Sequence, residues 1–197
     1  MTTTPYHVLL IILLLLAFSP STSYGLDFDF FQNSACTSDQ PHVSCMSIPA
    51  ATCCTGGSPW CAYVRGNGLP EGRAMRTYNK SDCGGSIVQS CKGQRPPAYC
   101  CADLGGGSQC ATYWQAGVAR RDDEDASPVC TRRVQPNRMV YTDATGLRQE
   151  IHLPKGTVDE ATGYLQAGDF EGLAKYPAWA NQAYEDEEDT ESIPLDP

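Results

Sequence analysis

Cysteine is the residue type that most constrains this fold, because all eleven cysteines of the 197-residue chain lie between Cys36 and Cys130. They make up roughly 12% of that stretch, above the roughly 8–10% that marks a disulfide scaffold in a short secreted chain. We therefore expect a small, disulfide-rich fold in which covalent bonds supplement a modest hydrophobic core. The cysteines expected in disulfide bonds are Cys36, Cys45, Cys53, Cys54, Cys61, Cys83, Cys91, Cys100, Cys101, Cys110 and Cys130.

The N-terminal segment predicts secretion. Residues 8–18 form an apolar run without a charged residue. Such a run is shorter than the ~20 residues of a membrane span and fits the ~7–15 residues of a signal-peptide core. Small residues follow and predict cleavage after Gly25, with an uncleaved anchor as the alternative. We expect an extracellular protein in an oxidising compartment, with disulfides rather than thiolate–metal sites and no membrane span after signal removal.

The cysteine pattern occurs twice along the chain. Its spacing is C-x8-C-x7-CC-x6-C from Cys36 and C-x7-C-x8-CC-x8-C from Cys83. Self-similarity within a period of ~20–50 residues is typical of a repeated supersecondary unit. The repeat predicts two homologous units that cover each other's apolar faces. Equivalent cysteines should then form equivalent bonds, two within each unit, and the fifth cysteine of each unit should bond its counterpart or Cys130.

Each unit is predicted to be mainly β. An apolar residue alternates with an aspartate from Leu26 to Phe30, which is the period of a half-buried strand. The second unit opens with a similar short segment, residues 75–78. Asp29 and Arg76 hold matching places in the two segments, so they form a cross-strand ion pair if these strands lie side by side.

The C-terminal part is predicted to contain a β-hairpin. Turn-forming residues at 143–146 separate two β-type segments, and Leu147, Ile151 and Leu153 are expected on one face. Asn67-Gly68 predicts a tight turn between the two cysteine-rich units. The expected organisation is a signal peptide at 1–25, unit 1 at 26–64, a connecting loop at 65–73, unit 2 at 74–119, a charged linker at 120–136, the extension with its hairpin at 137–184 and a disordered acidic tail at 185–197.

Two kinds of modification are predicted from local motifs. Asn79 begins the sequon Asn-Lys-Ser and is expected to carry an N-linked glycan on an exposed turn. Arg121 and Arg133 each end a dibasic pair, which kexin-like secretory proteases cut in exposed segments. Ordinary surface arginines are the alternative.

The odd number of cysteines leaves one without an intrachain partner, which allows a disulfide-linked dimer. Cys130 lies outside both repeats and between the two dibasic pairs. We hypothesise that it bonds a repeat cysteine and tethers the extension after cleavage.

Aromatic residues cluster beside the cysteines and are candidates for a binding surface. Rings held by disulfides can stack on sugar rings or protein partners, but they can equally replace a missing hydrophobic core. The candidates are Trp60, Tyr63, Tyr99, Tyr113 and Trp114.

The sequence contains few of the residues and motifs that a catalytic or metal site needs. The mature chain keeps two histidines, His42 and His152, and neither has the spacing of a zinc site. It has no nucleophile-elbow, phosphate-loop or metalloprotease motif. A net charge of −9 disfavours nucleic acid as a partner. We therefore expect no cofactor, no metal, no nucleic-acid partner and no enzymatic activity.

The signal, the Cys-Cys pairs and the short acidic mature chain resemble the small secreted cysteine-rich proteins of fungi, a class that includes effectors and cell-wall-associated proteins. Unit 1 also resembles hevein-type chitin-binding modules through Cys36-x8-Cys45 and Cys53-Cys54-x6-Cys61, with Trp60 before Cys61. Its spacing departs from that pattern between Cys45 and Cys53. These resemblances imply binding to a cell-wall carbohydrate or to a host protein.

The function expected from the sequence is extracellular binding by a disulfide-stabilised protein without catalytic activity. The ligand is an unidentified surface carbohydrate or a host or neighbour protein. The alternative is a secreted inhibitor or toxin-like protein that inserts a rigid loop, such as residues 64–73, into its target. A secreted hydrolase comes third.

Overall fold

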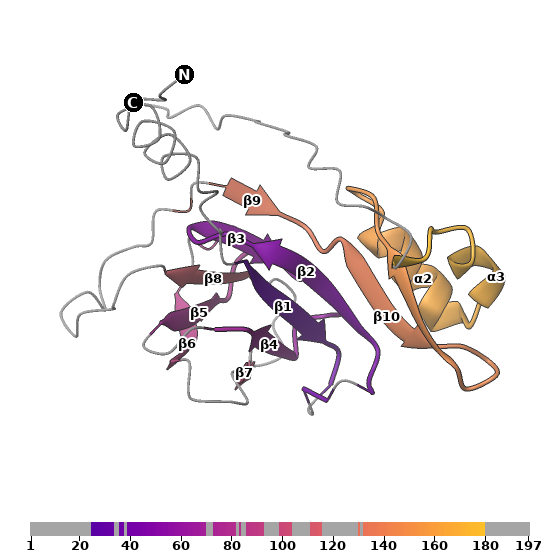
Figure 1. Ribbon diagram of the computed structural model, residues 1–197, viewed down its shortest axis with the longest axis horizontal. Helices are drawn as coiled ribbons and strands as arrows, with labels where there is room; N and C mark the ends of the chain where they lie inside the picture. Colours follow the sequence, from indigo (N-terminus) through magenta and orange to yellow (C-terminus); the bar gives the residue numbers. More distant parts are fainter. Residues whose placement is uncertain are drawn as a thin grey trace, which may run out of the picture.

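The computed structural model describes residues 25–33, 36–37, 39–69, 73–81, 83, 86–92, 99–103, 111–115, 130 and 132–179. These residues are mainly β-structure, arranged in two sheets, with two short helices near the C-terminal end (Figure 1). The elements are β1 (Leu26–Phe31), β2 (His42–Ile48), β3 (Thr52–Thr55), β4 (Tyr63–Asn67), β5 (Ala74–Tyr78), β6 (Ile87–Lys92), β7 (Tyr99–Asp103), β8 (Ala111–Gln115), β9 (Arg132–Val134), β10 (Arg138–Thr142), β11 (Arg148–His152), α2 (Val158–Ala167) and α3 (Phe170–Leu173).

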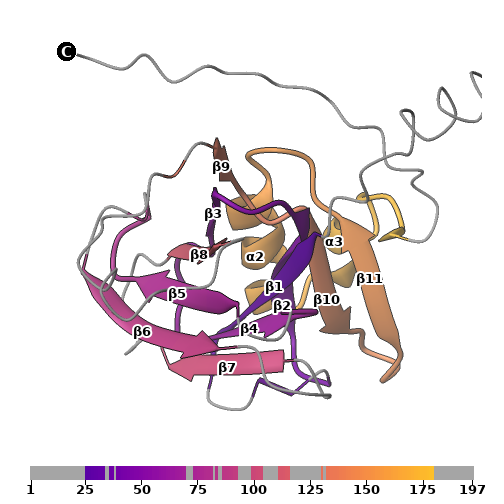
Figure 2. The ribbon, with the colours of Figure 1, turned by 60° about the vertical axis from the view of Figure 1, so that its left-hand side comes forward.

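The two sheets exchange one strand each. The six-stranded sheet has the order β11-β10-β2-β1-β4-β7, and the five-stranded sheet has the order β6-β5-β8-β3-β9. Strand β7 pairs with β4 in the sheet that contains β1 and β2, whereas β3 pairs with β8 in the sheet that contains β5 and β6. Figure 2 shows β5 and β6 crossing beside β1 and β4, with β7 running along the lower edge. We call β1–β4 the first cysteine-rich range and β5–β8 the second. Each sheet contains one strand from the range that supplies three strands of the other sheet.

The first, second and fourth strands of each range pair in the same way. In the six-stranded sheet, Phe28 lies opposite Cys45 on β2 and opposite Gly66 on β4. In the five-stranded sheet, Met75 lies opposite Cys91 on β6 and opposite Trp114 on β8. The order β2-β1-β4 thus has a counterpart in β6-β5-β8 with corresponding register.

The hydrophobic core lies between the sheets and the C-terminal helices. Phe28, Phe30 and Val43 contribute from the six-stranded sheet, and Met75 contributes from the other. The Cys45–Cys54 disulfide crosses this core and joins β2 to β3. A second disulfide, Cys53–Cys83, joins β3 to the segment after β5. Because β2 and β3 belong to different sheets, the first bond locks the sheets together.

The C-terminal extension packs on the first cysteine-rich range. The hairpin of β10 and β11 is present, and β10 also pairs with β2. Helix α2 turns its buried side chains, Val158, Ala161 and Thr162, to the core and ends at Gly168, which has a left-handed backbone. The Trp60 indole N–H donates to the Thr162 hydroxyl at 2.8 Å, which gives a buried donor its acceptor.

Several sequence expectations need correction. Residues 65–67 belong to β4 and not to the connecting loop. Leu147 is 63% exposed in the hairpin turn, whereas Ile151 and Leu153 are buried as expected. The loop turns the chain before β11 begins, and so Leu147 does not share their face.

The expected cross-strand pair of Asp29 and Arg76 is wrong. Strand β1 pairs with β2 and β4, whereas β5 pairs with β6 and β8 in the other sheet. Each opening strand lies inside its own sheet with both edges already paired, so the two strands do not lie side by side. The signal segment 1–24 and the tail 185–197 lie outside the described residues, as do most of the linker at 120–136 and Cys110.

The disulfide pattern differs in part from the expectation of bonds within units. Cys45–Cys54 closes within unit 1, but Cys53–Cys83 joins the two ranges, and the partner of Cys53 is not its counterpart in the repeat. Cys36 and Cys61 are also disulfide-bonded. The reason is the position of β3, which lies in the sheet formed by the later strands.

The Cys53–Cys83 bond should contribute strongly to stability because it closes a loop with a sequence separation of 30. Chain-entropy arguments give about 3–4 kcal/mol for such a loop. We expect the double variant C53A/C83A to lose about that much free energy of unfolding in a denaturant titration. The matched variant C45A/C54A, with a separation of 9, should lose less of this entropic contribution but should open a cavity between the sheets. Unchanged stability of C53A/C83A would contradict the assignment.

Candidate functional site

The face of the six-stranded sheet that points away from the core carries a row of polar side chains. Strand pairing places His152, Arg138, Ser44, Asp29 and Arg65 side by side on five successive strands. Side chains alternate along a strand, so these residues share the face opposite to the core residues Phe28, Phe30 and Val43. We call this the outer face.

A buried aspartate lies at the centre of the outer face. Asp29 is 1% exposed. Its Oδ1 accepts a hydrogen bond from the Ser44 hydroxyl at 2.6 Å and lies 3.4 Å from Nη2 of Arg138. Its Oδ2 accepts from Nη2 of Arg65 at 2.8 Å and from the Asn67 amide at 2.7 Å. One carboxylate thus joins β1 to β2, β4 and β10.

The surroundings of Asp29 keep it ionised. Burial by itself raises the pKa of this carboxyl group. The charge of His42 in its protonated form, the Ser44 hydroxyl and the Arg65 guanidinium outweigh burial and lower the pKa below its ordinary value. Burial lowers the pKa of His42, whose Nδ1 lies 2.7 Å from the Gln40 carbonyl. Neutral His42 with its proton on Nδ1 therefore lies next to a charged Asp29, which the arginines balance.

Ser44, His42 and Asp29 do not form a nucleophilic triad. In such a triad the base lies between the nucleophile and the carboxylate. Here the Ser44 hydroxyl donates directly to Asp29, and His42 Nε2 lies 3.9 Å from the same carboxylate. All three side chains are buried. Within the described part of the chain, no group of three or more His, Cys, Asp or Glu residues is arranged to hold a metal ion.

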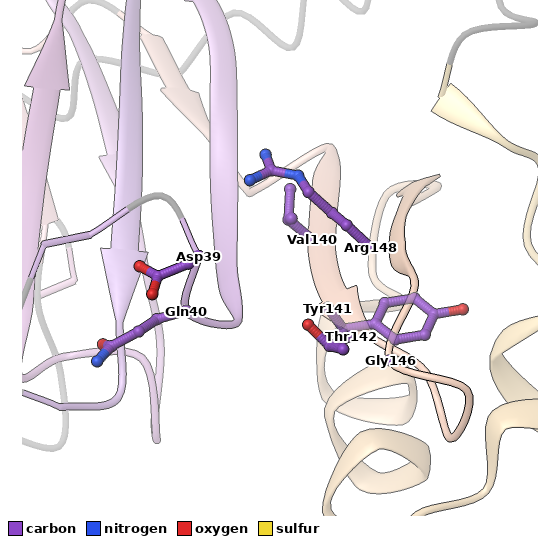
Figure 3. Close-up of a pocket in the computed structure, with 7 residues that line it drawn as sticks. All are labelled: Asp39, Gln40, Val140, Tyr141, Thr142, Gly146 and Arg148. Carbon is purple, nitrogen blue, oxygen red and sulfur yellow. The ribbon is translucent and has the colours of Figure 1, made fainter.

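A shallow hollow of about 200 Å³ lies at one end of the outer face, between the loop before β2 and the β10–β11 hairpin (Figure 3). Val140 and Thr142 of β10 lie on the side of the hairpin that faces the loop, whereas Tyr141 points to the helices. Asp39 and Gln40 line the hollow from the loop, and in this view their side chains extend away from the hairpin. Its lining residues are Asp39, Gln40, Val140, Tyr141, Thr142, Gly146 and Arg148.

The polar side chains around the hollow are held in defined positions. Glu150 accepts hydrogen bonds from Nε and Nη2 of Arg148, at 3.1 and 2.9 Å. The turn beside the hollow is closed by Asp143, which accepts from the Thr145 hydroxyl and backbone, the Gln149 amide and the Leu147 N–H. These bonds lower the pKa of Asp143 to about 2. The carboxylate that closes the hairpin turn is therefore ionised at neutral pH.

The aromatic residues expected to form a binding surface do not gather at this hollow. Trp60 is fully buried in the core, so its ring cannot meet a surface ligand. Tyr63 lies on the outer face opposite Phe31 and is partly exposed. The side chains of Tyr99, Tyr113 and Trp114 lie outside the described part of the structure.

The predicted modification sites fall in different surroundings. Asn79 is exposed just after β5, and its glycan stays a prediction. Arg133 lies within β9, whose backbone pairs in parallel with β3. Cleavage after Arg133 would require this pairing to open, which disfavours processing there in the folded protein. Arg121 lies outside the described residues.

Cys130 is free, so the hypothesis that it bonds a repeat cysteine is wrong. Its sulfur lies 3.0 Å from the Arg132 carbonyl oxygen, and its side chain packs against Cys53 and Cys83. Those two cysteines are bonded to each other. The two cysteines that Cys130 packs against are thus already bonded to each other.

The residues around the hollow were not singled out from the sequence. Asp39 and Gln40 lie about a hundred residues from Thr142 and Arg148 in the chain, and the pairing of β2 with β10 brings them together. No local motif marks such a site. The clearest sequence signal was the hairpin itself, which identified one wall of the hollow.

Comparisons with protein-family models, curated proteins and solved structures found no match. Among the described helices, none has the length and apolar character needed to cross a membrane. The assignment of function therefore rests on the chemistry of the outer face and its hollow.

Asp29 should be the residue on this face whose charge most affects stability. Replacing it by asparagine keeps the size but leaves Arg65 and Arg138 without their buried counter-charge, so D29N should lose about 3 kcal/mol of unfolding free energy at neutral pH. The folded pKa lies below the ordinary value of 3.8. The stabilisation is thus complete above that value and is lost as the pH falls below it.

Denaturant titrations between neutral and acidic pH would test this expectation. The control is D27N, because burial raises the pKa of Asp27 and already disfavours its charge. The difference between wild type and D29N should shrink below about pH 4, and D27N should differ little from wild type. A difference for D29N that stays constant down to strongly acidic pH would contradict the role of the charge.

Proposed function

We propose that the protein is a secreted, non-enzymatic binding protein that holds a neutral carbohydrate in the hollow between the loop before β2 and the β10–β11 hairpin. Secretion is supported by the N-terminal apolar run and by buried disulfides, which persist in oxidising compartments. The binding role is supported by the mixed polar lining of the hollow.

The lining matches a ligand that both donates and accepts hydrogen bonds. Asp39 only accepts, Arg148 only donates, and Gln40 and Thr142 do both. An anion would need donors alone, and a cation would need acceptors alone. A sugar hydroxyl both donates and accepts, so neighbouring hydroxyls of a neutral sugar can use every kind of group in the lining.

The hairpin wall of the hollow supplies the clearest part of this match. Thr142 and Arg148 are exposed, and Figure 3 shows both side chains on the side of the hairpin that faces the loop. The Thr142 hydroxyl both donates and accepts hydrogen bonds, whereas the Arg148 guanidinium only donates. These exposed hydrogen-bonding side chains on one wall of the hollow are the observation that carries the proposal.

The alternative of an inhibitor with an inserted loop has less support. Residues 64–67 of the proposed loop lie in β4, and Val64 is fully buried. Leu69 is fully buried as well. A loop whose residues are paired and packed in this way cannot enter the active site of a target without unfolding part of the sheet.

Binding to insoluble polysaccharide should depend on the hollow. We expect the secreted protein to be retained on at least one of chitin, β-glucan and cellulose. T142V removes a hydroxyl from the hairpin wall of the hollow, and R148Q removes a guanidinium. Each should weaken retention about two- to tenfold, since one hydrogen bond contributes roughly 0.5–1.5 kcal/mol. Depletion assays with increasing amounts of polysaccharide would give the apparent dissociation constants.

The control is E171Q, which changes an exposed carboxylate on α3 and should bind like wild type. Failure of the wild type to bind any of the three polysaccharides would refute the proposal. Inhibition of a protease by that same protein would favour the inhibitor instead.

The two cysteine-rich ranges are best explained by an internal duplication. The cysteine spacing repeats, and the order and register of β2-β1-β4 correspond to those of β6-β5-β8. By the order of the cysteines, Cys45–Cys54 has the counterpart Cys91–Cys101. In the same way, Cys53–Cys83 has the counterpart Cys100–Cys36, which agrees with the bonded state of Cys36.

Partial reduction followed by mass spectrometry should therefore find Cys36 bonded to Cys100 and Cys91 bonded to Cys101. The physical reason is that equivalent strands in equivalent register place equivalent cysteines at bonding distance. A bond between Cys36 and Cys61 would contradict the duplicated pattern, because both would then belong to unit 1.

A further inference from the structure

We infer that the ligand is an extended carbohydrate chain that lies along the outer face of the β10–β11 hairpin, with Trp179 as a second contact beyond the hollow. This inference rests on the proposed function and adds the length of the ligand and the position of an aromatic subsite. It starts from the size of the hollow. At about 200 Å³, the hollow is smaller than the ~300–1,000 Å³ of pockets that enclose larger ligands. It can therefore take one small unit, and a longer ligand must continue over the surface.

Trp179 lies flat over the opposite end of the hairpin. Its ring stacks on the His152 imidazole, with centroids 5.9 Å apart and planes inclined by 24°. The Arg138 guanidinium lies 5.8 Å from the centroid of the same ring. His152 and Arg138 are direct cross-strand partners on the outer face, so both lie beneath the indole, which turns its opposite side away from the sheet.

The backbone fixes this tryptophan in place. The His152 N–H donates to the Pro177 carbonyl oxygen at 2.8 Å, and Ala178 forms a bridge with Ile151. The ring is partly exposed. A flat aromatic surface held by the backbone and by an arginine beneath it is the kind of group on which the apolar face of a sugar ring stacks.

A continuous polar strip connects Trp179 to the hollow. Glu150 contacts Arg138 at 3.4 Å and Arg148 at 2.9 Å, so these three side chains follow one another along the hairpin. From Arg138 to Thr142 the strip spans four residue steps, or about 14 Å at ~3.4 Å per residue. This length suits a short oligosaccharide and exceeds a single sugar ring.

Affinity should therefore depend on the length of the ligand. We would measure binding of cello-, chito- and laminari-oligosaccharides of increasing length, together with their monosaccharides, by isothermal titration calorimetry. The affinity of the wild type should rise about two- to tenfold once the oligomer reaches Trp179, because a favourable aromatic contact contributes about 0.5–1.5 kcal/mol. W179A should bind oligomers no better than the monosaccharide, and W179F should recover most of the gain.

Further readouts separate the subsite from a structural role. Monosaccharide affinity should be the same in W179A and wild type, because the hollow does not include Trp179. Tryptophan fluorescence should change when an oligomer binds to wild type and should change much less in W179F. The control V88A shortens an exposed side chain on β6, in the other sheet, and should leave binding unchanged.

The outcomes distinguish this inference from the proposed function. Equal dependence on length in wild type and W179A would overturn the aromatic subsite while leaving the hollow as a binding site. Equal affinity of the wild type for monosaccharide and oligomers would also overturn it. Absence of binding to every sugar would refute the proposed function, and this inference with it.

Discussion

A single buried carboxylate, that of Asp29, holds the outer face of the six-stranded sheet together. It accepts hydrogen bonds from Ser44 on β2 and from Arg65 and Asn67 on β4, and it pairs with Arg138 on β10. Because Arg138 belongs to the C-terminal hairpin, the same carboxylate keeps that hairpin beside β2. The hollow lies at this junction, so its existence depends on a charge that burial alone would disfavour.

Local patterns in the sequence predicted β1 and the hairpin, since alternation and turn residues act over a few positions. The spacing of Val158, Ala161 and Leu165 before Gly168 carried an equally local signal for α2 that was missed. The prediction that the connecting loop begins at residue 65 was wrong for another reason. Gly66 lies in β4, where a Cβ atom would come within 2.8 Å of the Met75 sulfur, so this glycine serves close packing and not a turn.

The exchange of β3 and β7 could not be predicted, because it is decided by which edges the other strands leave open. The same holds for the candidate site. Asp39 and Gln40 meet Arg148 only through the pairing of β2 with β10, and Trp179 reaches the outer face through the bridge of Ala178 to Ile151. Such long-range pairing depends on register and on the whole sheet, not on neighbouring residues.

Rigid placement is what allows a small, shallow hollow to serve as a binding site. Ordering a flexible side chain when a ligand binds costs about 0.5–1.5 kcal/mol, a large fraction of what one hydrogen bond to a sugar contributes. Here Glu150 already orients Arg148, and Asp143 already fixes the turn. The Cys45–Cys54 bond prevents the sheets behind them from separating. The groups that would meet a ligand are thus positioned by the fold before the ligand arrives.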